Sequence, residues 1–169
     1  INLGAEIVIS NTFSTNKHAL SDAEQGHNFE ALNERAVKLA VEAREHLNKD
    51  NVLVAGGISY WIWTDNKPSL GELNSSIAQQ AKIMADAGAD LIMLEMMKDI
   101  EQMMTTLKAA QTSELPIWVG LSCEPDKSNK MCLLDGDSLE DTIQELKSYN
   151  PDVINIMHTE VEYVDQCLD

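Results

Sequence analysis

The stretches GAEIVISNTF (residues 4–13) and GADLIMLEMM (residues 88–97) repeat one pattern. Each begins with glycine, alanine and an acid, continues through four apolar or small residues, and then reaches a polar side chain: Asn11 in the first and Glu95 in the second. Such nearly continuous apolar runs are typical of strands covered on both faces, as in a parallel sheet. We therefore interpret both stretches as buried parallel strands with a polar residue where each apolar run ends.

Similar apolar runs recur along the chain and alternate with segments of helical periodicity. The expected strands cover residues 6–10, 52–55, 91–94, 117–121 and 153–157. The expected helices, which place apolar residues on one stripe, cover residues 29–47, 73–88, 98–111 and 137–149. Asp137 and Ser138 are alternative N-caps for the last helix, and Gly88 is a plausible C-terminal residue for the second. This alternation predicts an α/β fold with a mostly parallel sheet.

The composition is that of a soluble, folded domain. The chain has 169 residues, of which 44% are hydrophobic and 24% charged, so we expect one domain covering residues 1–169. The net charge of -16 argues against nucleic acid and anionic membrane surfaces as partners, since both are polyanions. No apolar run approaches the roughly 20 residues that a membrane-spanning helix needs.

The cysteines favour a reducing compartment. Cys123, Cys132 and Cys167 lack metal-type spacing, and an odd number is a poor disulfide framework. The chain opens on strand-like sequence rather than on a secretion signal, so we expect a cytoplasmic protein. Cys123 follows the fourth expected strand; it is interpreted as a small buried hydrophobe, with a position in the pocket as the alternative.

Two α/β architectures fit five strands. One is a complete doubly wound sheet of the flavodoxin-like kind, and the other is five-eighths of a (β/α)8 barrel, which needs about 250 residues. Both bind ligands beyond the carboxyl ends of the strands, which predicts that Asn11 and Glu95 face one shared site. In the alternative reading, Asn11 only opens a turn and Glu95 caps the following helix.

The chain resembles the homocysteine S-methyltransferase family, which includes betaine-homocysteine methyltransferases and the homocysteine domain of cobalamin-dependent methionine synthase. The motifs that carry the resemblance are GAEIVISNTFST, LNERAVKLAVEAREH, VLVAGGIS, AGADLIMLEMM, LPIWVGLSCE and LLDGDSLEDTI. They are similar to the family's second strand, the helix after it, its third, fourth and fifth strands, and an Asp-Gly helix start. The series runs over nearly the whole chain in the family's order and spacing.

The resemblance implies an α/β fold of the parallel TIM-barrel type, present as an incomplete barrel of about five β/α units. The second to sixth barrel strands would lie in this chain. Such an arc leaves unpaired sheet edges and an uncovered inner face, so we expect homo-oligomers or self-association through those edges.

The resemblance also implies the chemistry. In the family, a zinc ion held by three cysteines binds the sulfur of homocysteine, which then attacks the methyl group of a donor; a coordinated thiol is deprotonated. Aligning PDVINIMHTE with the family's Gly-x-Asn-Cys motif places Asn155 at the glycine, Met157 at the asparagine and His158 at the zinc cysteine. Imidazole is a good zinc ligand, so His158 is the metal candidate; a loop histidine without metal is the alternative.

The substrate pocket that the resemblance implies is lined by Asn11, Thr12, Phe13, Gly56, Glu95 and Ser122. Glu95 matches the family carboxylate that binds the amino group of homocysteine. Trp61 and Trp63 lie in the loop after the strand at 52–55, where they would either cover the pocket or pack under the loop.

Two functional classes follow. The first is an enzyme that transfers a methyl group from a small-molecule donor to a thiol acceptor such as homocysteine, with zinc. The second is a non-catalytic or truncated family member that binds an amino-acid-like ligand without zinc-thiolate chemistry. We also expect Met96, Met97, Met103 and Met104, read as helically spaced, to fill the core.

Overall fold

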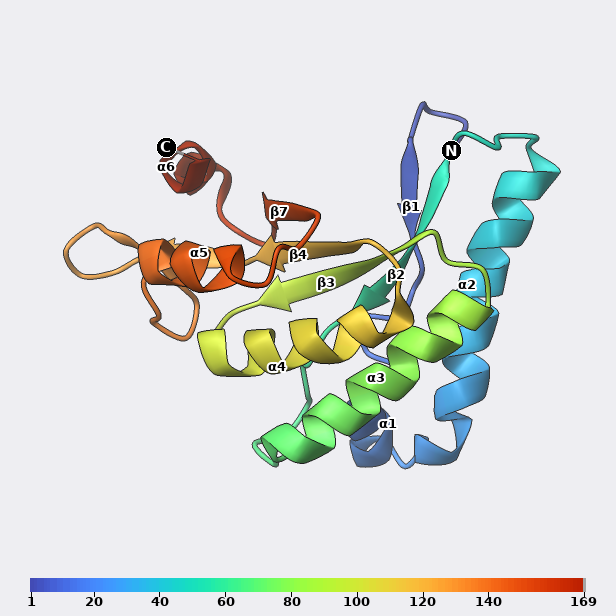
Figure 1. The fold of residues 1–169 in the computed structure, drawn as a ribbon, viewed down its shortest axis with the longest axis horizontal. Helices are drawn as coiled ribbons and strands as arrows, with labels where there is room; N and C mark the ends of the chain where they lie inside the picture. Colours follow the sequence, from blue (N-terminus) through green and yellow to red (C-terminus); the bar gives the residue numbers. More distant parts are fainter. Residues whose placement is uncertain (169) are drawn as a thin grey trace.

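The computed structural model describes residues 1–168 and contains one five-stranded parallel sheet (Figure 1). The strand order is β1-β2-β3-β4-β7, and every neighbouring pair is parallel. The strands are β1 (Ile7–Ile9), β2 (Leu53–Ile58), β3 (Leu91–Met97), β4 (Ile117–Leu121) and β7 (Val153–Ile156). All five predicted strands are therefore confirmed, in one sheet.

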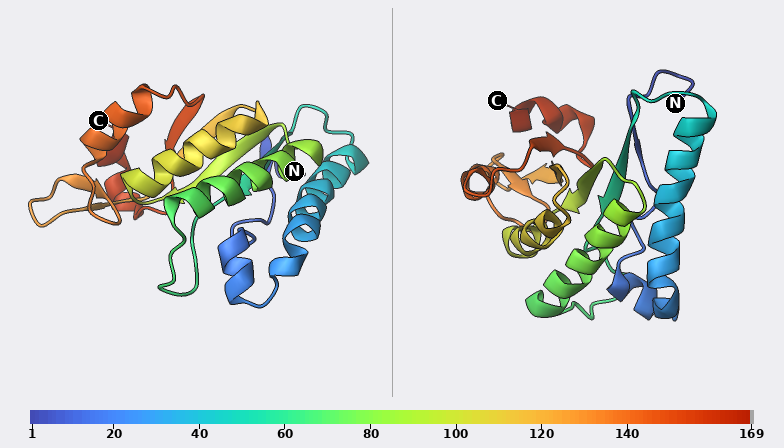
Figure 2. Two further views of the ribbon diagram at one scale, coloured as in Figure 1. Left: turned by 60° about the horizontal axis from the view of Figure 1, so that its bottom comes forward. Right: turned by 45° about the vertical axis from the view of Figure 1, so that its right-hand side comes forward.

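Helices α2 to α5 run along one face of this sheet (Figures 1 and 2). The helices are α1 (Lys17–Asp22), α2 (Phe29–His46), α3 (Leu70–Asp86), α4 (Ile100–Ala110), α5 (Leu139–Lys147) and α6 (Val164–Leu168). Short 3-10 turns cover Gly26–Asn28, Gln111–Ser113 and Val161–Tyr163. The four predicted helices are confirmed, whereas α1 and α6, which have only six and five residues, were not predicted.

The helix starts follow ordinary capping chemistry. Ser69 and Glu72 form a reciprocal capping box at α3. At α5 the cap is Ser138, whose hydroxyl accepts a hydrogen bond from the Asp141 N–H at 3.3 Å. Asp137, the other predicted cap, instead accepts from the N–H of Ile100 at 2.7 Å. It therefore joins the start of α4 to the start of α5.

An antiparallel hairpin of β5 (Cys123–Pro125) and β6 (Met131–Leu133) follows β4. Its turn is closed by the Asp126 carboxylate, which accepts from the N–H groups of Ser128 and Lys130 at 2.7 and 2.9 Å. This hairpin was not predicted, because strands of three residues are too short to show an alternating pattern.

The two faces of the sheet have different environments. Val54, Leu94 and Val119 are fully buried beneath the helices and belong to the main core. Side chains on the opposite, inner face are partly open: Ile9 is 44% exposed and Leu53 is 40% exposed. A smaller buried cluster of Ala55, Leu91 and Met93 also lies on the inner face, with Ile7 and Trp118 against it.

Strand β3 contains an irregularity near its end. Its register with β4 shifts between Leu94 and Met97, and Met96 has a φ of 56°. The methionines at 96 and 97 are buried as predicted, but they lie in a strand and not at helical spacing. The helical reading was wrong for these two because a short apolar run carries no periodicity that separates strand from helix.

The sheet is open at both sides. β1 and β7 each pair with one neighbour, so among the described residues their outer edges carry unpaired backbone groups. Self-association through these edges stays a prediction. No helix within residues 1–168 is long and apolar enough to cross a membrane.

Candidate functional site

Glu95 is a half-buried carboxylate on the inner face of the sheet. Its side chain crosses from β3 onto β2 and lies over Gly57: a Cβ on that glycine would be 3.2 Å from the carboxyl carbon of Glu95 and would collide with a carboxylate oxygen. Burial raises the pKa of Glu95 above its ordinary value. Within residues 1–168 the carboxylate has neither a hydrogen-bond donor nor a cation as partner.

The two adjacent glycines of β2 face opposite sides of the sheet. A Cβ on Gly56 would point toward α3 and lie 2.8 Å from the sulfur of Met84 and 3.1 Å from Cδ1 of Ile92. Gly57 faces the inner surface, where Glu95 and Ile9 surround it. The glycine that gives the carboxylate its room is therefore Gly57. The assignment of Gly56 to the substrate pocket stays a prediction.

The loop after β1 is pinned to the end of β2. Thr12 is fully buried, and its hydroxyl donates to the carbonyl of Gly57 at 2.6 Å. The hydroxyl of Ser10 accepts from the N–H of Gly57 at 3.2 Å and lies 2.8 Å from the hydroxyl of Thr12. These bonds fix the backbone of the residue over which Glu95 lies.

Asn11 points elsewhere. It is exposed and lines a hollow between β1 and α2, together with Leu32 and Leu39. Glu95 is not among the residues that line this hollow. The structure therefore does not bring the two polar residues of the repeated strand pattern into one pocket.

Aromatic side chains gather beside the loop after β1. The ring of Phe13 lies 5.8 Å from that of Trp61, which in turn lies 4.4 Å from that of Trp63. The carbonyl of Trp61 accepts from the side-chain amide of Asn16 at 2.6 Å. The cluster joins the loops after β1 and β2, and Trp63 is 64% exposed at its outer side. Whether this cluster covers a substrate stays a prediction.

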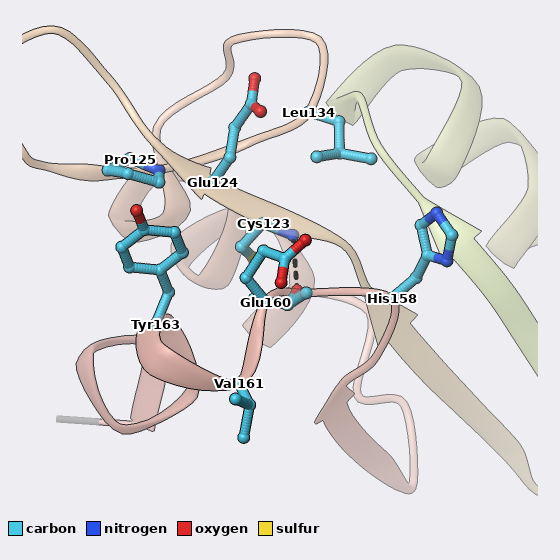
Figure 3. A pocket seen from close by; sticks show the side chains of 9 residues that line it. Cys123, Glu124, Pro125, Leu134, His158, Glu160, Val161 and Tyr163 are labelled. Atoms are coloured by element: carbon cyan, nitrogen blue, oxygen red, sulfur yellow. Dashed lines mark hydrogen bonds between the residues drawn. The ribbon is translucent and has the colours of Figure 1, made fainter.

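The end of β7 is fixed by a set of hydrogen bonds to β4. The N–H of Met157 donates to the carbonyl of Leu121 at 2.9 Å. Its carbonyl accepts from the hydroxyls of Ser122 and Thr159 at 3.1 and 3.0 Å. Thr159 also accepts from the N–H of Cys123 at 2.9 Å, which is the dashed line in Figure 3. The fully buried Ser122 thus supports the backbone beside His158.

His158 lies directly after this fixed segment, in a left-handed conformation with a φ of 49°. It lines a wide hollow together with Cys123, Glu124, Glu160 and Tyr163. In Figure 3 the imidazole lies on the opposite side of this hollow from Tyr163.

The described residues do not by themselves form a zinc site. No group of three or more His, Cys, Asp or Glu side chains within residues 1–168 is arranged to hold a metal ion. Cys123, the thiol of the same hollow, is 2% exposed, and burial, aided by the nearby Cys167, raises its pKa to about 12. Its thiol is therefore protonated at neutral pH, in agreement with its interpretation as a buried hydrophobe.

Three further residues shape the site and were not predicted to do so. Gly57 makes room for Glu95, and Met157 covers Gly120 on the inner face. Tyr60 accepts from the N–H groups of Lys98 and Asp99 at 2.7 and 3.2 Å, which ties the end of β2 to the start of α4. The alternation of side chains along β2 is the only sequence signal for Gly57, and it depends on the strand's register.

Comparison with solved structures identifies the architecture. The metallated form of the homocysteine methyltransferase MmuM from Escherichia coli superposes with a TM-score of 0.81 at 21% identity, covering 99% of this chain and 62% of that one. The apo form of the same enzyme gives a TM-score of 0.75 at 20% identity and covers 99% and 61%. The chain thus spans less than two thirds of these neighbours. The predicted incomplete TIM barrel is confirmed, in place of the flavodoxin-like alternative.

Sequence comparison agrees with the structural likeness. A search of curated proteins gives no significant match. The family model for homocysteine S-methyltransferase matches residues 1–169, which is the whole chain. The chain therefore belongs to the homocysteine S-methyltransferase family.

Proposed function

We propose that the complete gene product transfers a methyl group from a small-molecule donor to the thiol of homocysteine. The sulfur–carbon bond forms as the donor–methyl bond breaks, and the thiol proton is lost. Family membership supports the reaction class. The observation that carries the substrate is Glu95, a half-buried carboxylate that has no cation or donor within residues 1–168.

Glu95 suits the ammonium group of an amino acid. Burial disfavours its ionised form, as the raised pKa shows, and nothing among the described residues offsets that cost. A ligand ammonium would supply both the missing charge and a charge-assisted hydrogen bond.

The surrounding predicted residues take two roles in this proposal. Thr12 and Ser122 are buried and hydrogen-bonded to backbone, so they hold the pocket walls in place. Asn11 lines a separate hollow against α2, whereas Phe13 and the backbone at Gly56 are proposed to line the pocket. Their side chains or backbone lie near the carboxyl ends of β1 and β2, where barrel enzymes bind their substrates.

His158 is proposed as one ligand of a zinc ion whose other ligands come from outside the described residues. When bound, zinc would lower the pKa of the substrate thiol. Within residues 1–168, His158 has no two further metal-binding side chains arranged around the same point. Zinc content of the complete gene product tests this: about one zinc per chain is expected, with loss in the His158→Ala variant.

The second candidate is a protein that binds an amino-acid-like ligand without thiolate chemistry. Two observations favour it: the described residues lack a three-ligand cluster, and the thiol of Cys123, which lines the same hollow as His158, is protonated at neutral pH. Ligand binding without zinc and without methyl transfer would select this candidate.

The remaining finer proposals concern the setting. The cysteines of the described residues are free, which supports a cytoplasmic location, and the two open edges of the sheet support self-association. A thiol substrate, a methyl donor and a role in methionine biosynthesis follow from the proposed reaction. Each is proposed for the complete gene product.

Calorimetric binding tests the substrate. We expect the wild-type protein to bind L-homocysteine and the Glu95→Gln variant to bind it about 10- to 100-fold more weakly, since a hydrogen bond to a charged group contributes about 1.5–3 kcal/mol. Exposed Glu101 in α4 offers the matched control, Glu101→Gln. Binding of 4-mercaptobutanoate, which lacks the amino group, should not depend on Glu95. Equal weakening of both ligands would contradict the ammonium assignment.

A further inference from the structure

The side chain of Met157 fills a definite position on the inner face. A Cβ on Gly120 would lie 2.9 Å from Cγ of Met157 and would collide with its sulfur. Gly120 pairs with Asn155, and it follows Val119, which pairs with Leu94, the residue before Glu95. Gly120 therefore lies between Asn155 of β7 and the bulge of β3 that contains Glu95 and Met96, and the thioether of Met157 covers it.

The backbone of Met157 is fixed, but its side chain is held weakly. Three hydrogen bonds hold the backbone through Leu121, Ser122 and Thr159. The thioether sulfur accepts one bond, from the N–H of Met96 at 3.3 Å, and thioether sulfur is a weak acceptor. A methionine side chain has three rotatable bonds and adapts readily to its surroundings. The side chain of Met157 can therefore change its rotamer while the backbone stays in place.

The carboxamide of Asn155 beside it lacks proper partners. Its Oδ1 is buried and accepts no hydrogen bond within residues 1–168. Its Nδ2 lies 3.8 Å from the sulfur of Met93, a weak contact. Oδ1 would lie 3.0 Å from a Cβ on Gly120, so the free acceptor borders the space that Met157 fills. A buried polar atom without a partner is costly and calls for an explanation.

We propose that the space over Gly120 is the subsite for the sulfur-bearing arm of the ligand, and that Met157 occupies it in the free protein. The inference rests on the proposed function. The side chain of Met157, CH2–CH2–S–CH3, is the same group as that of methionine, the methylated form of homocysteine. The N–H of Met96 would donate to a ligand sulfur as it does to Met157, and Asn155 Oδ1 would accept from a ligand thiol.

Calorimetry on the complete gene product tests the inference. A binding-competent state that is only partly populated weakens apparent affinity by its population, so emptying the subsite in Met157→Ala should tighten binding of L-homocysteine and L-methionine by about tenfold. Met157→Leu keeps the apolar bulk and should stay near wild type. Unchanged or weaker binding by the alanine variant would overturn the proposal.

Methionine methyl NMR gives a second readout that does not need the alanine variant to fold. The ε-methyl resonance of Met157, assigned by its disappearance in Met157→Leu, should shift when L-homocysteine saturates the protein. Met84, fully buried on the helix side of the sheet, is the internal control.

The outcomes separate the two proposals. If the wild type binds homocysteine through Glu95 while the Met157 resonance does not move, the subsite is refuted and the proposed function stands. If neither the wild type nor Met157→Ala binds homocysteine, both are refuted.

Discussion

The adjacent glycines Gly56 and Gly57 allow a stringent test, because one methyl group added to either side of β2 meets different neighbours. In Gly57→Ala the new methyl meets the end of the Glu95 side chain and lies 3.0 Å from Cγ2 of the 44%-exposed Ile9. Both neighbours can move. In Gly56→Ala it meets Met84 and Ile92 at 2.8–3.1 Å, and both are fully buried.

The expected magnitudes follow from these contacts. Overpacking a core costs about 1–3 kcal/mol, and the preference of a strand for alanine over glycine returns about 0.5–1 kcal/mol, so Gly56→Ala should lose about 0.5–2 kcal/mol and lower the melting temperature by about 1–8 °C in a chain of this size. For Gly57→Ala, alanine is favoured over glycine within a strand by about 0.5–1 kcal/mol, which offsets the smaller clash and leaves the melting temperature nearly unchanged. The displaced carboxylate should nevertheless weaken L-homocysteine binding by about 10- to 100-fold.

Two measurements on both variants test on which side of β2 the ligand binds. Circular dichroism gives the melting temperature, and calorimetry gives the affinity for L-homocysteine. The reasoning is refuted if Gly57→Ala binds homocysteine as the wild type does. It is equally refuted if Gly56→Ala keeps its melting temperature and alone loses the ligand, since that would place the binding site on the other side of β2.

Three further outcomes are expected. Burial raises the pKa of Glu95 above 4.5, so the folded protein binds the Glu95 proton more tightly than the unfolded chain does, and the wild type loses stability as pH rises from 4.5 through the raised pKa. Glu95→Gln should therefore be more stable than wild type at pH 7 and should lose this advantage below pH 4.5. Urea denaturation at a series of pH values measures the difference. Thr12→Val removes the buried bond to Gly57 and should cost about 1–3 kcal/mol in urea unfolding, whereas a loss below 0.5 kcal/mol would mean that the bond does not hold the loop. The isolated chain of residues 1–169 should sediment and scatter light as a species larger than a monomer, and a sharp monomer peak with little binding of a hydrophobic dye would contradict edge-mediated association.

The sequence predicted the strands well but misplaced where two of them end. β2 was expected to stop at Ala55, where the run of apolar side chains ends, yet it continues through two glycines to Ile58. β3 was expected to stop before Glu95, because a polar residue after an apolar run resembles a strand end, yet it continues to Met97 through a bulge. In both strands, pairing with a neighbour overrode the local signal.

The same two strands explain why the site was only partly predictable. The sequence singled out Glu95, since a carboxylate directly after an apolar run can be recognised from the order of residues alone. It could not show that the carboxylate lies over Gly57 rather than Gly56, because that depends on the register in which Gly57 pairs with Met93. Nor could it show that Asn11 faces α2, since the direction of a loop residue is set by contacts such as that of Thr12 with Gly57.

Asn155, Met157 and His158 lie together at the end of β7. Asn155 and Met157 both place bulk on the inner face, where Gly120 provides the room. His158 then follows on a backbone fixed by Ser122 and Thr159. Because His158 directly follows Met157 in the chain, zinc content and ligand affinity should be measured on the same variants.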